Sequence, residues 1–257
     1  MDLSGFNGVI MDLDGVLWKG ENVVKGAPEK VNELKNKGIK VVFLTNNASK
    51  SRKNYLEKLW RLGFDASVDE IITSGYATAK YIRESYGESK VYAIGMDGLT
   101  NELALERHKL VDSNADVVAV GMDENFTYEK LKKGFKNIRN GAHLVACNDD
   151  AVGPREDDLV PAAGAIVKAL EYCANVKAEV VGKPNKPIMD ITLKKLGLRP
   201  DECVMVGDSI KTDIIAGKNF GLKTALLRSR LSDFESADSM EVAPDFVLND
   251  ISEIEVK

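Results

Sequence analysis

The chain has few of the residues on which several kinds of functional site depend. It contains two histidines, His108 and His143, and three cysteines, Cys147, Cys173 and Cys203. Two histidines cannot form a multi-histidine metal site, and three distant cysteines without a Cys-x-x-Cys pair argue against a zinc site or a disulfide framework. We therefore expect reduced, buried thiols and a functional site built from other side chains.

The chain also lacks long apolar runs and clusters of one charge. Its 35 Lys and Arg and 40 Asp and Glu residues give a net charge of −5 without long like-charge blocks, which argues against nucleic acid or an anionic membrane as a partner. No apolar run approaches the length of a membrane span, and the segment Met1-Asp2-Leu3-Ser4 lacks the basic region of a signal peptide. We expect a cytoplasmic protein.

Two nucleotide and phosphate motifs are missing as well. Gly182-Lys183 is followed by Pro184, and Gly217-Lys218 by Asn219, so the Gly-x-x-x-x-Gly-Lys-[Ser/Thr] loop of many ATP-binding proteins is not present. No cysteine is followed six positions later by the arginine that a cysteine phosphatase needs. Both absences direct attention to the acidic residues.

The most informative stretch is an apolar run that ends in two carboxylates. Val9-Ile10-Met11 leads into Asp12-Leu13-Asp14-Gly15, as expected for a strand buried on both faces of a parallel sheet. If the chain stays extended through Leu13, Asp12 and Asp14 project to the same side. By itself, the pattern could equally be a polar turn at the end of a strand.

The segments that follow alternate between strand and helix patterns. Pro28 and Gly38 bracket an amphipathic helix, and Ser51 and Gly63 bracket a second one. Strands are expected at residues 39–44, which lead into Thr45-Asn46-Asn47, and at residues 70–75. This βαβαβ order predicts an α/β fold, a Rossmann-like three-layer core around a parallel sheet with right-handed crossovers.

A second α/β module interrupts this core. Residues 80–177 contain their own expected strands at 91–94, 116–120 and 144–147, and we interpret them as an inserted cap domain between two core segments, 1–79 and 178–257. The first sheet is expected to resume at Glu179–Pro184 and to continue with strands at 203–207, 223–227 and 245–248. Asp208 directly follows one of these strands, and Asp213 is expected in the first turns of the next helix.

Polar residues thus follow several expected strands of one sheet. They are Asp12 and Asp14, Thr45 with Asn46, Lys183, and Asp208 with Asp213. Carboxylates close together are costly unless a cation or ligand compensates them, and ligands that are all oxygen favour Mg²⁺ over zinc.

A phosphoryl group fits this set of side chains. Mg²⁺ and Lys183 would neutralise its oxygens, Thr45 would hold them, and Asp12 would attack phosphorus in line. Asp14 would protonate the leaving oxygen and later activate water. We assign Asn46 and Asn47 to the same phosphate site, and Ser209 and Asp213 to supporting roles.

Four pieces of the sequence resemble the four motifs of the haloacid dehalogenase superfamily of phosphatases. They are Asp12-Leu13-Asp14-Gly15-Val16, Leu44-Thr45-Asn46-Asn47, Gly182-Lys183-Pro184, and Gly207-Asp208-Ser209 with Thr212-Asp213. The Thr-Asn-Asn sequence, the Gly-Lys-Pro and the large insertion between motifs two and three are similar to the p-nitrophenylphosphatase-like, or NagD-like, branch.

The resemblance implies specific roles. Mg²⁺ would be held by the carboxylates of Asp12 and Asp208 and by the backbone carbonyl of Asp14, while Asp213 would orient Lys183 or a metal-bound water. The expected activity is hydrolysis of a small phosphorylated metabolite through an aspartyl-phosphate. A phosphomutase or phosphotransferase that uses the same intermediate, or a non-catalytic phosphoaspartate switch, is the alternative.

The resemblance also implies that a loop of the insertion closes over the leaving group. This chain has Cys147-Asn148-Asp149-Asp150 where the family has Thr-Asn-Pro-Asp, and Pro161-Ala162-Ala163-Gly164 where the family has Pro-Gly-Ala-Gly. The candidates for substrate choice are Asn148, Asp149, Asp150, Arg155 and Gly164. The insertion could also form a homodimer interface. The sequence does not identify the physiological substrate.

Overall fold

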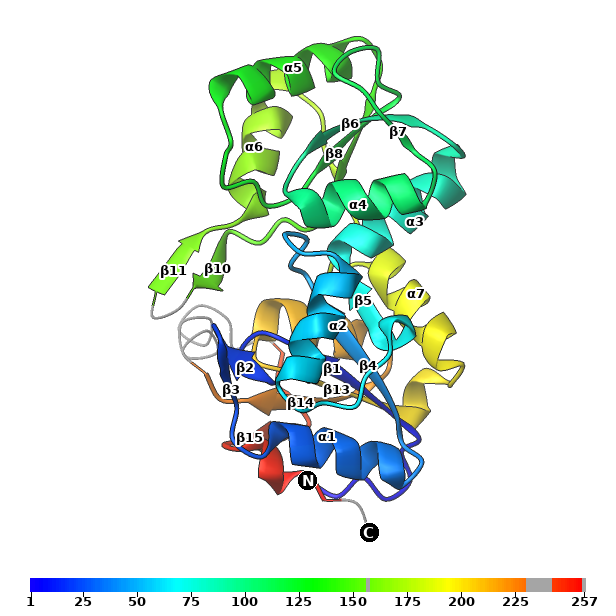
Figure 1. Cartoon of the computed structure of the whole chain (residues 1–257), viewed down its shortest axis with the longest axis vertical. Helices are drawn as coiled ribbons and strands as arrows, with labels where there is room; N and C mark the ends of the chain where they lie inside the picture. Colours follow the sequence, from blue (N-terminus) through cyan, green and yellow to red (C-terminus); the bar gives the residue numbers. More distant parts are fainter. Residues whose placement is uncertain (156–157, 230–241, 256–257) are drawn as a thin grey trace. The chain divides into compact units, whose positions relative to one another are not determined.

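The structure is a computed structural model, and it describes residues 1–155, 158–229 and 242–255. The chain forms two compact units (Figure 1). The first comprises Met1–Thr45, Tyr55–Ile72 and Met189–Lys257, and the second comprises Asn46–Asn54 and Thr73–Ile188. The second unit contains the insertion expected at 80–177 and extends beyond it at both ends. The boundaries drawn from sequence stay a prediction.

A six-stranded sheet forms the centre of the first unit, in the order β15-β14-β13-β1-β4-β5. Its central strand β1 is buried along its whole length and pairs in parallel with both β13 and β4, which confirms the predicted α/β fold with a parallel sheet. The strands are β1 (Gly8–Asp12), β4 (Lys40–Thr45), β5 (Ile71–Thr73), β13 (Cys203–Gly207), β14 (Lys223–Leu227) and β15 (Phe246–Leu248).

The helix α1 (Ala27–Asn36) shows how sequence positions elements around this sheet. Pro28 lies in its first turn, where a missing backbone N–H costs nothing, and Gly38 follows its end with a φ of 82°. Val31 and Leu34 are buried in the same core as Phe43 of β4. The other helices with residues in this unit are α2 (Arg52–Arg61), α7 (Lys186–Leu196), α8 (Ile215–Asn219) and the short turns η1 (Val68–Glu70), η2 (Pro200–Glu202), η3 (Ile210–Ile214) and η4 (Ile251–Glu253).

A five-stranded parallel sheet forms the centre of the second unit, in the order β12-β9-β8-β6-β7. Its strands are β6 (Lys90–Ile94), β7 (Lys109–Leu110), β8 (Val117–Val120), β9 (His143–Ala146) and β12 (Glu179–Val180), and its helices are α3 (Ser74–Tyr86), α4 (Asp97–Leu105), α5 (Tyr128–Arg139) and α6 (Ala163–Ala174). Helices α5 and α6 share a core with one face of this sheet, where a side chain at Gly134 would press on Ile94 and Leu170. A larger residue there would need both neighbouring side chains to shift by a few tenths of an ångström.

One expectation about the sheets was wrong. Glu179–Pro184 was expected to continue the first sheet, but β12 pairs in parallel with β9 in the second unit, Glu179 opposite Val145. An apolar pattern predicts that a segment is a strand, but it does not specify the sheet that the strand joins. Lys183 therefore follows a strand of the second sheet, and not of the first.

Two hairpins were not predicted. Strands β2 (Trp18–Lys19) and β3 (Asn22–Val23) pair antiparallel soon after β1. The segment 148–155, expected to be a loop, ends in β10 (Val152–Arg155), which pairs antiparallel with β11 (Asp158–Pro161). Within the residues that the structure describes, no helix has the length and apolar character needed to cross a membrane.

Candidate active site

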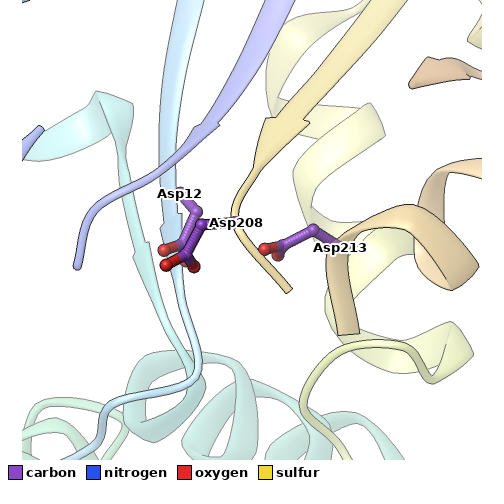
Figure 2. A group of neighbouring side chains, drawn as sticks. All are labelled: Asp12, Asp208 and Asp213. Carbon is purple, nitrogen blue, oxygen red and sulfur yellow. The ribbon is translucent and has the colours of Figure 1, made fainter. Parts of the chain in front are cut away.

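Three buried aspartates of the first unit converge at the carboxyl ends of its central strands. Asp12 ends β1, Asp208 directly follows β13, and Asp213 lies in η3. Each is at least nine-tenths buried, and each offers a carboxylate oxygen that lies within 4.8 Å of the others (Figure 2). Because β1 and β13 are parallel neighbours, both strands deliver their carboxylates to the same edge.

Two glycines make this approach possible. A Cβ at Gly15, whose φ is 89°, would lie 2.0 Å from Oδ2 of Asp208, and a Cβ at Gly207 would lie 2.1 Å from Oδ2 of Asp213. Any side chain at either position would displace a carboxylate of the cluster. The glycine after Asp12-Leu13-Asp14 and the one before Asp208 are therefore part of the site's geometry.

A wide helical turn brings Asp213 back to the end of the strand. The sequence predicted the start of an ordinary helix here, but η3 is a π-helical turn from Ile210 to Ile214. The backbone N–H of Ser209 donates to Oδ2 of Asp213 at 3.1 Å, and Ser209 Oγ accepts from the N–H of Thr212 at 3.1 Å. Ser209 thus caps the start of the turn and bonds to the carboxylate of Asp213. Single π turns of this kind are frequent at functional sites.

Asp14 does not continue the extended strand. The strand β1 ends at Asp12 and the chain bends at Leu13, so the condition for the two aspartates to share a side is not met. Oδ1 of Asp14 accepts a hydrogen bond from Nε1 of Trp18 at 2.8 Å. Asp14 is thus oriented by a side chain to which the sequence analysis gave no role.

Thr45 lies at the end of β4, next to β1, and is buried. A side-chain hydrogen bond joins it to Tyr55 of α2. Burial raises the pKa of the Tyr55 hydroxyl well above its ordinary value, and the negative charges of Asp14 and Asp12 add to the rise. Tyr55 is therefore a neutral hydroxyl beside three predicted site residues. No motif marked it in the sequence, because only the packing of α2 brings it there.

A network of hydrogen bonds in the second unit centres on Asn46 and includes Lys183, Asn148 and Asp150. Oδ1 of Asn46 accepts from the backbone N–H of Lys183 at 2.7 Å, and Nδ2 donates to the carbonyl of Lys183 at 3.0 Å. The same Nδ2 lies 3.0 Å from Oδ2 of Asp150. The backbone carbonyl of Asn46 accepts from Asn148 Nδ2 at 2.6 Å and from the Ser74 hydroxyl. The amide of Asn46 thus fixes the backbone of Lys183.

The remaining predicted residues of this unit have different surroundings. Gly164 packs against the loop, since a Cβ there would lie 2.4 Å from the carbonyl of Asp149, and its N–H donates to the carbonyl of Asp150 at 3.0 Å. The side chain of Asp149 is exposed. Oδ1 of Asn47 accepts from the N–H of Ser49 at 2.9 Å. The side chain of Arg155 lies outside the described part of the structure. Phosphate binding by Asn46, Asn47 and Lys183 stays a prediction.

Comparisons with known families show which proteins this chain is similar to. Residues 9–106 match the family described as haloacid dehalogenase-like hydrolase, and residues 180–254 match a family described as HAD-hydrolase-like. An acid sugar phosphatase from Staphylococcus epidermidis is 36% identical over 248 residues, which cover 96% of each chain.

Solved structures give the same result. A p-nitrophenyl phosphatase from Archaeoglobus fulgidus superposes with a TM-score of 0.90 at 33% identity, covering 96% of this chain and 97% of that one. A 4-nitrophenylphosphatase from Thermotoga maritima superposes with a TM-score of 0.90 at 32% identity, covering 98% and 97%. The likeness spans nearly the whole of this chain.

Proposed function

Because the chain belongs to the haloacid dehalogenase-like hydrolases, in their p-nitrophenylphosphatase-like branch, and is a phosphatase, we propose that it hydrolyses small phosphomonoesters through a phosphate ester of Asp12 and depends on Mg²⁺. The observation that carries the proposal is the cluster of Asp12, Asp208 and Asp213 at the carboxyl edge of the first sheet. The names of the relatives extend the proposal to phosphorylated sugars as a substrate class.

The cluster fits a hard divalent cation. Three carboxylates that are each at least nine-tenths buried, with oxygens within 4.8 Å of one another, repel strongly unless a cation compensates their charge. Every group that the cluster offers is a carboxylate oxygen, which is the donor type that Mg²⁺ prefers. Asp12, Asp208 and the backbone carbonyl of Asp14 would hold the ion, with Asp213 beside them. When bound, Mg²⁺ would neutralise charge on the phosphate oxygens.

In this proposal, hydrolysis takes place in two displacements at phosphorus, and Asp12 and Asp14 act in both. In the first, a carboxylate oxygen of Asp12 attacks phosphorus, the bond from phosphorus to the ester oxygen breaks, and Asp14 gives a proton to the departing oxygen. In the second, Asp14 takes a proton from water as that water attacks phosphorus. The bond from phosphorus to Asp12 then breaks, inorganic phosphate leaves, and both aspartates return to their initial states.

Binding of the phosphoryl group falls to neutral and cationic donors. Thr45, at the end of the strand next to Asp12, can donate its hydroxyl to a phosphate oxygen. Lys183, whose backbone is fixed by Asn46, would supply a positive charge in the transition state. Its role is proposed from the motif that it shares with the family. The cytoplasmic location and the homodimer expected from sequence also stay predictions.

The test compares Asp12→Asn with a matched substitution of an exposed aspartate. Wild type and Asp65→Asn, at the surface of the same unit, should hydrolyse p-nitrophenyl phosphate with Mg²⁺. Asp12→Asn should unfold at the wild-type temperature, show no turnover and carry no phosphate after rapid acid quench with a labelled substrate. Substantial Mg²⁺-dependent turnover by Asp12→Asn would show that another group attacks phosphorus. A panel of sugar, nucleotide and small acid phosphates then ranks the substrates by kcat/KM.

A further inference from the structure

The indole of Trp18 is the direct side-chain partner of Asp14. Nε1 of Trp18 donates to Oδ1 of Asp14 at 2.8 Å. Trp18 is fully buried, and it lies in β2 of the hairpin that follows the motif. An indole N–H can donate but cannot accept, so it holds the carboxylate oxygen without competing for the proton that Asp14 transfers.

Three side chains fix the indole ring. Tyr55 stacks on it with ring centroids 6.3 Å apart and an angle of 13° between the planes, and Phe64 meets it edge-on at 6.5 Å. Nζ of Lys58 lies 4.3 Å from the ring centroid and also donates to the carbonyl of Gly20 at 2.7 Å. These contacts restrict the plane of the ring, and with it the direction of the N–H.

The backbone between the two residues is also fixed. The N–H of Gly15 donates to the carbonyl of Trp18 at 2.7 Å, and the N–H of Leu17 donates to the carbonyl of Leu13 at 2.9 Å. Asp14 and Trp18 form a bridge across this turn. The distance between the indole and the carboxylate is therefore set by the hydrogen bonds of this turn as well as by the packing of the ring.

We propose that Trp18 is a positioning residue for proton transfer by Asp14. Its N–H holds Oδ1, so Oδ2 is the oxygen that gives a proton to the leaving group and takes one from water. The inference rests on the proposed function, in which Asp14 is the acid and base. A general acid contributes only when its proton lies on the line to the departing oxygen, and a carboxyl group free to rotate loses part of that contribution.

The decisive variant removes the N–H and keeps the ring. In 3-benzothienylalanine, sulfur takes the place of the indole N–H, and site-specific incorporation at position 18 leaves Trp60 unchanged. The value of kcat/KM is measured with p-nitrophenyl phosphate, whose leaving group barely needs a proton, and with ethyl phosphate, whose leaving group does. Because kcat/KM includes steps only up to departure of the alcohol, it isolates the first proton transfer.

We expect the isostere to lose about 10- to 100-fold in kcat/KM with ethyl phosphate and less than about threefold with p-nitrophenyl phosphate, since the proton transfer is impaired and not abolished. Trp18→Phe should show the same selectivity with an additional loss of stability. Leu34→Val is the control for lost stability, because Leu34 is buried in the same core but is not one of the three side chains that fix the indole, and it should affect both substrates equally.

A double-mutant cycle with Asp14→Asn separates positioning from packing. Asp14→Asn alone should lower kcat/KM mainly for ethyl phosphate. Adding 3-benzothienylalanine at position 18 should then leave the ratio of the two kcat/KM values unchanged. Two results would overturn the inference. One is a variant with 3-benzothienylalanine at position 18 that keeps the wild-type ratio of the two kcat/KM values. The other is a further loss for ethyl phosphate, as large as in the wild-type background, when the same substitution is made in Asp14→Asn. Absence of the selective loss in Asp14→Asn itself would instead contradict the proposed role of Asp14.

Discussion

Asn46 and Lys183 are joined by two hydrogen bonds between the side-chain amide of one and the backbone of the other, at 2.7 and 3.0 Å. The side chain of Asn46 thus pairs with a backbone as a strand would, and it fixes the backbone of the lysine in Gly182-Lys183-Pro184. Both bonds are formed by buried residues. Asp150 accepts from the same amide nitrogen, which connects the predicted cap loop to Lys183 through one side chain.

We expect Asn46→Asp to destabilise the protein and weaken phosphate binding. The substitution keeps the size of the side chain but replaces the donating nitrogen by an oxygen that faces the carbonyl of Lys183 and the carboxylate of Asp150. The free energy of unfolding should fall by about 1–3 kcal/mol, as measured by urea denaturation, and KM should rise for every substrate. Asn47→Asp is the control for stability, because its exposed oxygen accepts from the N–H of Ser49 in either form. Equal stability of the two variants would contradict this role.

We expect Asp150→Ala to lower kcat/KM by a similar factor for all substrates, about tenfold. Asp150 acts in this structure through Asn46, whereas a residue that touches the leaving group would change substrates unequally. Asp149→Ala, with an exposed side chain, serves as the control. If kcat/KM fell by very different factors for p-nitrophenyl phosphate and sugar phosphates, Asp150 would have the role in substrate choice that the sequence suggested.

We expect Gly15→Ala to weaken Mg²⁺ binding about tenfold or more, because supporting contacts of a metal ligand have effects of this size. The added methyl group would collide with the carboxylate of Asp208. Gly26→Ala imposes similar backbone strain, since φ is 80°, but its Cβ would meet no atom within 4 Å. The measurement is a Mg²⁺ titration of activity after removal of metal with EDTA, with Asp208→Ala as the reference for a lost ligand. If Gly15→Ala needed the same Mg²⁺ concentration as wild type, Asp208 would not be a metal ligand.

Asp245 should contribute stability that disappears in acid. Partial burial acts to raise the pKa of its carboxyl group, but hydrogen bonds from Lys218, Lys223 and Thr224 outweigh burial and lower the pKa far below its ordinary range. A group with a lowered folded-state pKa stabilises the protein above its unfolded-state pKa, about 4, and loses this contribution as pH falls toward the folded-state value. At pH 7, Asp245→Asn should be less stable than wild type by about 1–3 kcal/mol.

Urea denaturation at pH 7, 5 and 3 tests this expectation. The stability difference between wild type and Asp245→Asn should be unchanged between pH 7 and pH 5 and smaller at pH 3. Asp250→Asn is a useful comparison, because its carboxyl group interacts chiefly with Ser252. A difference that grew in acid would have the wrong sign for a carboxylate stabilised by lysines.

The sequence allowed much of the first sheet and its aspartates to be predicted, because apolar strands that end in acids have a local signature. The strand containing Val204 and the one containing Val41 were recognised without tertiary information. The sheet that β12 joins could not be predicted, since two residues carry too little pattern to select a partner. Trp18 and Tyr55 were missed for a different reason. Their contacts with Asp14 and Thr45 depend on how a hairpin and a helix pack, which no local spacing encodes.

The pairing of β1 with β13 constrains how the chain can fold during synthesis. Gly8 pairs with Cys203, so the central pair of the first sheet cannot form until β13, which ends at Gly207, has left the ribosome. The strands β6, β8 and β9 of the second sheet follow one another closely in sequence and need no later segment to pair. Contacts between segments close in sequence form faster than distant ones. The second unit should therefore be folded while β1 can pair only with β4 and β13 has not yet been made, so Asp208 and Asp213 join Asp12 last.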